Sequence, residues 1–230
     1  WNEKPLGWLG VTAGPVMAAA DFFNIRIGGI GGHGGMPETS HDPVLAAAVL
    51  INAFQGIVAR NVPPMETAVL SVTRIHGGET YNVIPSQVEL AGTVRTYNPS
   101  TRERILSRMQ QQVELIGQAM ECTGELSVQS LTPAVVNDPW VTEHIQNLVP
   151  QILPSAQLDS DYRTTGSEDM AFLMKDRRSC FIFVGSANPV KGLTFGHHHP
   201  RFDIDETALT NASALLAAAA YEFLQDGSTD

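Results

Sequence analysis

The chain has 230 residues, 43% of them hydrophobic, which is enough for one large domain or two small ones. Its formal net charge is -10, and its 14 lysines and arginines are scattered along the sequence. This charge distribution excludes a nucleic-acid backbone or an anionic membrane surface as the expected partner. No apolar run approaches the roughly 20 residues that span a bilayer, so we also expect no membrane segment.

The two cysteines, Cys122 and Cys180, lie far apart and have no CxxC spacing. Such thiols are typical of a reducing compartment rather than of a disulfide framework, so we predict a cytoplasmic protein. The sequence starts at Trp1 without an initiator Met, and we therefore expect a processed or partial polypeptide.

Hydrophobic periodicity predicts the elements of the first 133 residues in chain order. Apolar residues at helical spacing predict two helices, which begin at Asp42-Pro43 and Asn98-Pro99. Because strand side chains alternate between two faces, alternating apolar residues predict strands. These strands lie at residues 21–30, 66–76, 88–96 and 125–131. The order βαββαβ is that of a ferredoxin-like sandwich, with both helices on one face of the sheet and the other face uncovered.

The two ends of such a unit lie close together, so it can be inserted into another domain. We therefore assign residues 21–133 to one domain and residues 1–20 and 134–230 to a second, α/β domain. The apolar run at residues 180–185 is continuous rather than alternating, which is typical of a strand in a parallel sheet covered on both faces. In the same domain we predict two helices, at residues 138–153 and 206–224.

His33 lies within the run GGHGGMP, where the backbone around it carries almost no side chains. Glycine accepts positive φ and lets a ligand or another backbone approach closely, so this histidine is predicted to be presented rather than packed. A flexible hairpin that happens to contain a histidine is the alternative. The run alone does not decide between the two.

Two polar residues of the same domain are further candidates. Asn82 lies in the loop GGETYNVIP between two predicted strands, although asparagine also serves turns through its own backbone. Arg95 is placed by the two-residue period on the sheet face opposite Val88, Leu90 and Val94. A guanidinium on an open face suits a bidentate contact with a carboxylate, and a solvated surface arginine is the alternative.

The second domain contains two polar clusters, TTGSED at residues 164–169 and GHHHP at residues 196–200. Adjacent carboxylates and histidines suggest a metal site, but consecutive residues point in different directions. At most one or two of the three histidines can therefore bind one ion, and a chance cluster near a turn is the alternative. Glu168 and Asp169 can instead cap the helix that follows them.

Together, the motifs GGHGGMP, NVIP, GTVRT, GSED and HHPRFD resemble those of the metal-dependent amidohydrolases of the peptidase M20 clan. The most similar branch contains hippurate hydrolase, N-acyl-amino-acid amidohydrolases and auxin-conjugate hydrolases. The resemblance implies an α/β catalytic domain of the zinc-peptidase type that holds two divalent metal ions, Zn or Mn. It also implies that the ferredoxin-like domain is an inserted lid that forms a homodimer.

By the same resemblance, His33 is the catalytic lid residue that crosses the dimer and polarises the scissile carbonyl of an N-acyl amino acid. Asn82 and Arg95 match residues that hold the substrate carboxylate. Gly166 and Ser167 match a loop that lines the substrate, and His198 matches the last metal ligand.

The sequence departs from the family pattern because the other metal ligands and the general-base glutamate lie upstream of the lid in that family. We therefore expect this chain to be the C-terminal portion of a longer enzyme. The fragment alone is expected to be inactive, and it need not bind either ion. The alternative function is a non-catalytic ferredoxin-like dimerisation or ligand-binding module. A peptidase or a succinyl-diamine deacylase of the same clan would differ only in its substrate.

Overall fold

The computed structural model describes residues 1–225, and residues 226–230 of the predicted second domain lie outside this description. The chain forms two compact units. One contains Trp1–Val16, Val135–Thr164 and Leu173–Asp230, and the other contains Met17–Ala134 and Thr165–Phe172. We call them the terminal unit and the sheet unit. The sequence-based boundaries differ from this division at residues 17–20, 134 and 165–172, which group with the sheet unit.

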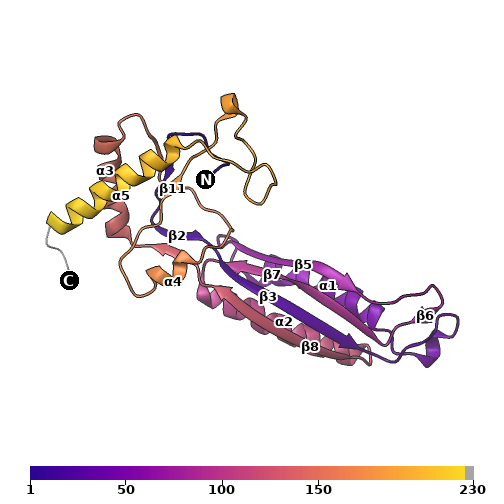
Figure 1. The fold of residues 1–230 in the computed structure, drawn as a ribbon. Coiled ribbons are helices and arrows are strands. Elements are labelled where there is room, and N and C mark those ends of the chain that lie inside the picture. The colour runs from indigo at the N-terminus through magenta and orange to yellow at the C-terminus, as the bar shows by residue number, and fades with distance from the viewer. Residues whose placement is uncertain (226–230) are drawn as a thin grey trace. The chain divides into compact units, whose positions relative to one another are not determined.

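The sheet unit has the predicted order of strands and helices and a mixed α/β fold. Its strands pair in the order β5-β7-β3-β8, and each neighbouring pair is antiparallel. Figure 1 shows both helices on the same face of this sheet. In chain order the elements are β3 (Ala19–Gly28), α1 (Pro43–Asn61), β5 (Ala68–His76), β7 (Gln87–Thr96), α2 (Pro99–Ala119) and β8 (Thr123–Thr132).

The two helices begin where the sequence predicts them. The Asp42 carboxylate accepts hydrogen bonds from the backbone N–H groups of Val44 and Leu45 at the start of α1. At the start of α2, the side-chain oxygen of Asn98 accepts from the N–H of Ser100. In both helices a proline follows the cap, where its missing N–H and fixed φ cost nothing.

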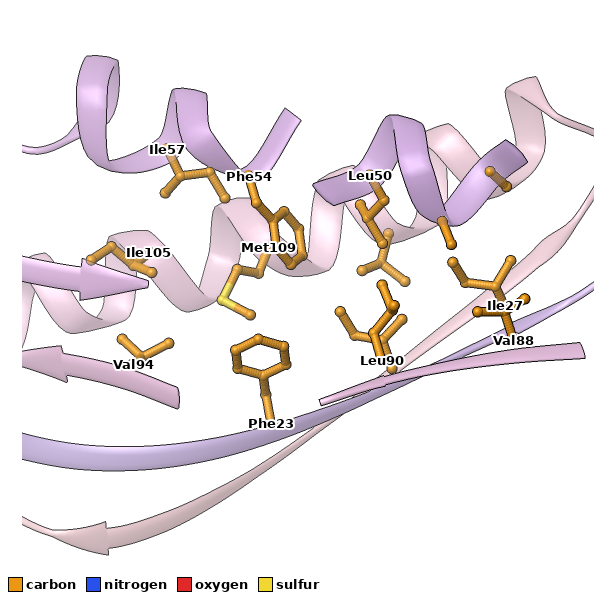
Figure 2. Packing of buried hydrophobic residues seen from close by; sticks show 14 of the residues in the cluster. Phe23, Ile27, Leu50, Phe54, Ile57, Val88, Leu90, Val94, Ile105 and Met109 are labelled. Carbon is orange, nitrogen blue, oxygen red and sulfur yellow. The ribbon is translucent and has the colours of Figure 1, made fainter. Parts of the chain in front are cut away.

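The core of the sheet unit lies between the sheet and the two helices. Phe23 of β3 is buried beneath Phe54 of α1 and Met109 of α2, as Figure 2 shows. The rings of Phe23 and Phe54 meet edge to face, with centroids 6.3 Å apart. Along β3 the buried residues alternate with exposed ones, among them Asn24 and Arg26. The other face of the sheet is therefore exposed, as predicted, and carries polar side chains together with the partly exposed ring of Phe22.

Helix α1 corrects the expectation that no apolar run of the sequence approaches the length of a membrane span. It is 19 residues long with a mean hydropathy of 1.5, so by length and composition it could cross a membrane. Its inner side packs into the core of the sheet unit through Leu50, Phe54 and Ile57. The helix is apolar because one side belongs to this core, while its outer side keeps exposed apolar residues.

The terminal unit contains a small sheet with the strand order β10-β1-β11. Two helices of this unit lie close to the predicted ranges. The bounds of its elements are β1 (Trp8–Gly10), β2 (Gly14–Met17), β9 (Val135–Asn137), α3 (Pro139–Ile152), β10 (Gln157–Asp159), β11 (Phe183–Val184), η2 (Pro189–Lys191) and α5 (Thr207–Gln225). Strands β2 and β9 form a separate two-stranded sheet.

The expectation of a parallel strand at residues 180–185 is wrong, because β11 pairs antiparallel with β1, although β10 is parallel to β1. Val184 packs against the core beneath α3 and α5, while Phe183 packs against the rings of Trp1 and Tyr162. Apolar neighbours on both sides explain the continuous apolar run. Burial on two faces does not encode the direction of the neighbouring strand.

Candidate active site

His33 lies on a loop that extends from the end of β3. The loop is closed at its base by the backbone pairing of Ile30 with His41. Within it, β4 (Gly32–His33) pairs antiparallel with β6 (Val83–Ile84), which places His33 directly opposite Val83. A short 3-10 turn, η1 (Pro37–Thr39), completes the loop. Figure 1 shows β6 beyond the end of the four-stranded sheet.

The same pairing brings His33 and Asn82 together. The N–H of Gly34 donates to the Asn82 carbonyl at 2.7 Å. A Cβ at Gly34 would lie only 3.2 Å from that carbonyl oxygen, so a glycine suits the close approach of the two segments. The Asn82 side-chain oxygen accepts a hydrogen bond from Thr80 at 2.9 Å, which orients the amide. Two-residue strands are too short to be found from periodicity, and the glycines are their only mark in the sequence.

The imidazole of His33 is exposed, and its hydrogen bonding determines which nitrogen can donate. The N–H of Gly35 donates to Nδ1 of His33 at 3.0 Å. Since Nδ1 is an acceptor, the neutral ring carries its proton on Nε2. The loop therefore presents an N–H donor outward, which is the group that stabilises a carbonyl oxygen as it gains negative charge.

Arg95 lies near the opposite end of the sheet, on the face away from the core. Its Nη1 donates to the hydroxyl of Ser167 at 2.7 Å. The neighbouring Gly166 carbonyl accepts a hydrogen bond from the N–H of Ala18 at 2.8 Å, which fixes this segment beside β3. Arg95 and Ser167 are thus in contact, although 72 residues separate them in sequence. Together they offer a guanidinium and a hydroxyl, which suit a carboxylate.

The pair His33–Asn82 and the pair Arg95–Ser167 are far apart within one chain. Ala20 of β3 lies opposite Arg95, whereas Gly28 of the same strand lies opposite Gln87, beside the loops that carry His33 and Asn82. Eight residues of extended strand correspond to about 27 Å. One small substrate therefore cannot contact both pairs of a single chain. We call them the distal half-site (His33, Asn82) and the proximal half-site (Arg95, Ser167).

Glu168 and Asp169 follow the proximal half-site and precede the short helix α4 (Met170–Met174). A hydrogen bond to Asp169, together with burial, raises the pKa of the Glu168 carboxyl. Glu168 also accepts a hydrogen bond from the backbone of Met170. The helix-cap interpretation therefore holds for Glu168.

The three consecutive histidines His197, His198 and His199 differ in their contacts. His197 packs on Trp1 and Phe202, and burial lowers its pKa. His199 stacks on Phe195, and its Nδ1 accepts the N–H of Arg201 at 3.0 Å. Their rings are thus committed to packing, whereas His198 has backbone φ 67° and no ring contact or hydrogen bond described for its side chain.

The residues present do not fit a metal centre by themselves. Among residues 1–225 there is no group of three histidine, cysteine, aspartate or glutamate side chains that could hold an ion. A catalytic zinc ion usually takes three protein ligands, and a two-metal centre needs more. His198 can contribute one ligand at most.

Neither cysteine is a candidate nucleophile. Both thiols are free, and burial raises the pKa of Cys122 and raises that of Cys180 to about 11. A nucleophilic cysteine needs a lowered pKa. Both residues therefore stay protonated near neutral pH.

The chain is similar to known peptidases and deacetylases. Residues 20–120 match the model of the peptidase dimerisation domain. N-acetyl-L-cysteine deacetylase of Bacillus subtilis is 35% identical over 226 residues, which cover 97% of this chain and 53% of the deacetylase. Thermostable carboxypeptidase 2 of Saccharolobus solfataricus is 30% identical over 223 residues, which cover 96% of this chain and 56% of the carboxypeptidase.

A solved structure agrees with these sequence matches. A dinuclear metal-binding peptidase of the M20 family from Bacillus subtilis superposes with a TM-score of 0.78 at 30% identity, over 98% of this chain and 55% of that chain. The chain is thus similar to M20 peptidases, and the relatives include amidohydrolases and deacetylases, as the motifs indicated. The chain spans about half the length of these relatives.

Proposed function

We propose that this chain is the substrate-recognition and dimerisation part of a longer metal-dependent amidohydrolase, which hydrolyses the amide bond of N-acyl amino acids. The observation that carries the proposal is the separation of the two half-sites by about 27 Å along one sheet. The deacetylase and the carboxypeptidase among the relatives are consistent with a substrate that has a carboxylate near the scissile amide.

In this proposal one substrate is held by two copies of the chain. Arg95 and Ser167 of one copy bind the carboxylate, and Asn82 of the partner adds an amide to the same group. His33 of the partner donates its Nε2–H to the carbonyl oxygen of the scissile amide. This donor is already oriented by Gly35, so no reorganisation is needed when negative charge develops on the oxygen.

The outer side of α1 and the edge strand β5 are the surface that we propose for the second copy. Helix α1 exposes Val44, Leu45 and Val49, and Ile75 of β5 is 57% exposed. The other helix, α2, instead carries five charged residues, Arg102, Glu103, Arg104, Arg108 and Glu114. An unpaired edge strand beside an apolar helix favours addition of another strand.

Antiparallel pairing of β5 with its copy also explains how the half-sites meet. Strand β5 runs from Ala68, opposite Thr96, to His76, opposite Glu89. Two-fold pairing aligns the end near Thr96 in one copy with the end near His76 in the other. The distal half-site of each copy then approaches the proximal half-site of its partner.

The lid is proposed to be inserted in an α/β catalytic domain that this chain contributes only in part. Two divalent ions, zinc or manganese, are proposed for the longer enzyme, with His198 as the ligand from this chain. Activation of the attacking water is assigned to parts of the enzyme outside the chain. A cytoplasmic location is proposed as well, and the two free thiols are consistent with it.

The alternative function is a non-catalytic dimerisation or ligand-binding module, and the missing ligand group among residues 1–225 favours it. Metal analysis and an amidase assay separate the two. We expect residues 1–230 alone to bind no stoichiometric metal and to be inactive, and the protein from its natural source to be longer and active on N-acyl amino acids. A source protein of 230 residues, or a longer one with no amidase activity, would contradict the proposed function.

A further inference from the structure

Three apolar side chains beside the distal half-site are half or fully exposed. Tyr81 immediately precedes Asn82 and is fully exposed, with a relative exposure of 111%. Val83 lies directly opposite His33 in the β4–β6 pair and is 49% exposed. Met36 donates its N–H to the His33 carbonyl at 2.8 Å and is 50% exposed. We call these three residues the apolar rim.

The apolar rim does not stabilise the loops that carry it. These loops are held by backbone hydrogen bonds, from Gly34 to Asn82, from Gly29 to Ser86 and from Met36 to His33. None of the three rim side chains belongs to the hydrophobic core of the sheet unit. A fully exposed aromatic ring lacks the hydrophobic stabilisation that burial of its surface would provide. Such rings often mark a binding surface. The tyrosine is therefore best explained by an occupant from outside the chain.

We propose that Tyr81, together with Met36 and Val83, contacts an apolar group of the substrate beside the scissile amide, and that Tyr81 determines the preference for such groups. This inference rests on the proposed function. His33 reaches the scissile carbonyl, so side chains that flank His33 and Asn82 lie beside the substituents next to that carbonyl. Those substituents are the acyl group on one side and the amino-acid side chain on the other. An apolar rim binds bulky apolar groups there and gains little from an acetyl or a methyl group.

The test compares substrates that differ in one substituent, using the longer enzyme. The acyl arm compares N-acetyl-alanine with N-benzoyl-alanine, and the side-chain arm compares N-acetyl-alanine with N-acetyl-phenylalanine. The wild-type enzyme is expected to prefer the bulky substrate in at least one arm. Tyr81→Ala is expected to reduce that preference in kcat/KM by about tenfold, whereas Tyr81→Phe keeps the ring and the preference. The affected arm identifies which substituent meets Tyr81.

Leu115→Ala is the matched control, because Leu115 is 64% exposed on α2 and belongs to neither half-site. It should leave the preference unchanged. The inference is overturned if Tyr81→Ala lowers kcat/KM equally for all three substrates, which indicates a role in orienting Asn82. It is also overturned if the variant dissociates the dimer in sedimentation experiments. A wild-type enzyme that hydrolyses none of the substrates would instead contradict the proposed function itself.

Discussion

The two ends of the four-stranded sheet hold their functional residues in different ways. At the distal end, backbone hydrogen bonds between glycine-rich loops support His33 and Asn82, and the side chains are exposed. At the proximal end, Arg95 is held by the side chain of Ser167, on a sheet also fixed by the buried Asp21–Arg102 ion pair. This difference supports the proposed function, in which each end provides one half of a site and the exposed distal half-site of one copy meets the proximal half-site of its partner.

The largest effect is expected at the distal end. His33→Ala in the longer enzyme should lower kcat by about 10²–10³ with little change in KM, because the donor to the developing oxyanion is lost. Steady-state kinetics with an N-acyl amino acid measures both constants. Wild-type kcat in a folded His33→Ala enzyme would remove the assigned role, and His144→Ala in the terminal unit serves as the control.

At the proximal end, the Asp21–Arg102 ion pair is expected to contribute to the free energy of unfolding. Arg102 donates from Nε and Nη2 to the two Asp21 carboxylate oxygens at 2.7 and 2.6 Å, and the Asp21 side chain is 1% exposed. Arg102→Met would leave a buried carboxylate without its partner, and we expect the free energy of unfolding to fall by about 3 kcal/mol. Urea denaturation measures this change. Arg108→Met on the exposed face of α2 should change it by less than about 0.5 kcal/mol.

Arg95 tests substrate binding at the proximal end. Arg95→Ala should raise KM for an N-acyl amino acid by about 10–100-fold and affect kcat less, since a hydrogen bond to a charged group contributes about 1.5–3 kcal/mol. An amide substrate without the free carboxylate should lose this dependence. If KM is unchanged with the carboxylate substrate, the arginine does not bind that group.

A substitution at Gly35 tests whether the orientation of the His33 ring matters at the distal end. A Cβ at this position would lie 3.2 Å from both Cε1 and Nδ1 of His33, so Gly35→Ala should displace the imidazole. We expect kcat to fall by about tenfold at unchanged stability. Gly56→Ala in α1 is the control, because a Cβ there meets no atom within 4 Å. Full activity of Gly35→Ala would show that the ring orientation is not critical.

The smallest expected effect is a pH dependence of the free energy of unfolding that arises from Glu168, beside the proximal half-site. The pKa of Glu168 is raised from its ordinary value of 4.5 by its hydrogen bond to Asp169. The hydrogen bond between Glu168 and Asp169 therefore contributes to the free energy of unfolding below pH 4.5. This contribution is lost as the pH rises through the folded-state pKa of Glu168. The loss should be under about 1 kcal/mol, measured as urea unfolding at pH 4.5 and 7. In Asp169→Asn the difference should shrink, whereas Glu143→Gln should leave it unchanged.

Much of the fold could be predicted because local chemistry determines it. The Asp42-Pro43 and Asn98-Pro99 pairs begin helices through cap hydrogen bonds that their own residues provide. The alternation of Val88, Leu90 and Val94 determines which face of β7 is buried, and hence the side on which Arg95 lies. The direction of β11 could not be predicted, because burial on both faces is the same for parallel and antiparallel neighbours.

The candidate residues were found from motifs, but their grouping required the structure. The contact of Arg95 with Ser167 joins residues 72 positions apart, and no local pattern indicates it. The donor nitrogen of His33 depends on one backbone N–H, from Gly35. The separation of Asn82 from Arg95 follows from the length and register of β3 and β7. Strand length is visible in the sequence, but the partner of each strand is not.

The most direct test of a site completed by a second copy is complementation between two variants, each of which is nearly inactive at substrate concentrations well below KM. Co-expression of His33→Ala and Arg95→Ala chains of the longer enzyme, each with its own affinity tag, yields mixed dimers. In a mixed dimer one site combines wild-type Arg95 with wild-type His33 from the partner, while the other site lacks both. The account predicts recovery of about one quarter of the wild-type activity in the statistical mixture, since half of the dimers are mixed. No recovery in purified mixed dimers would contradict it, because both residues would then act within one chain.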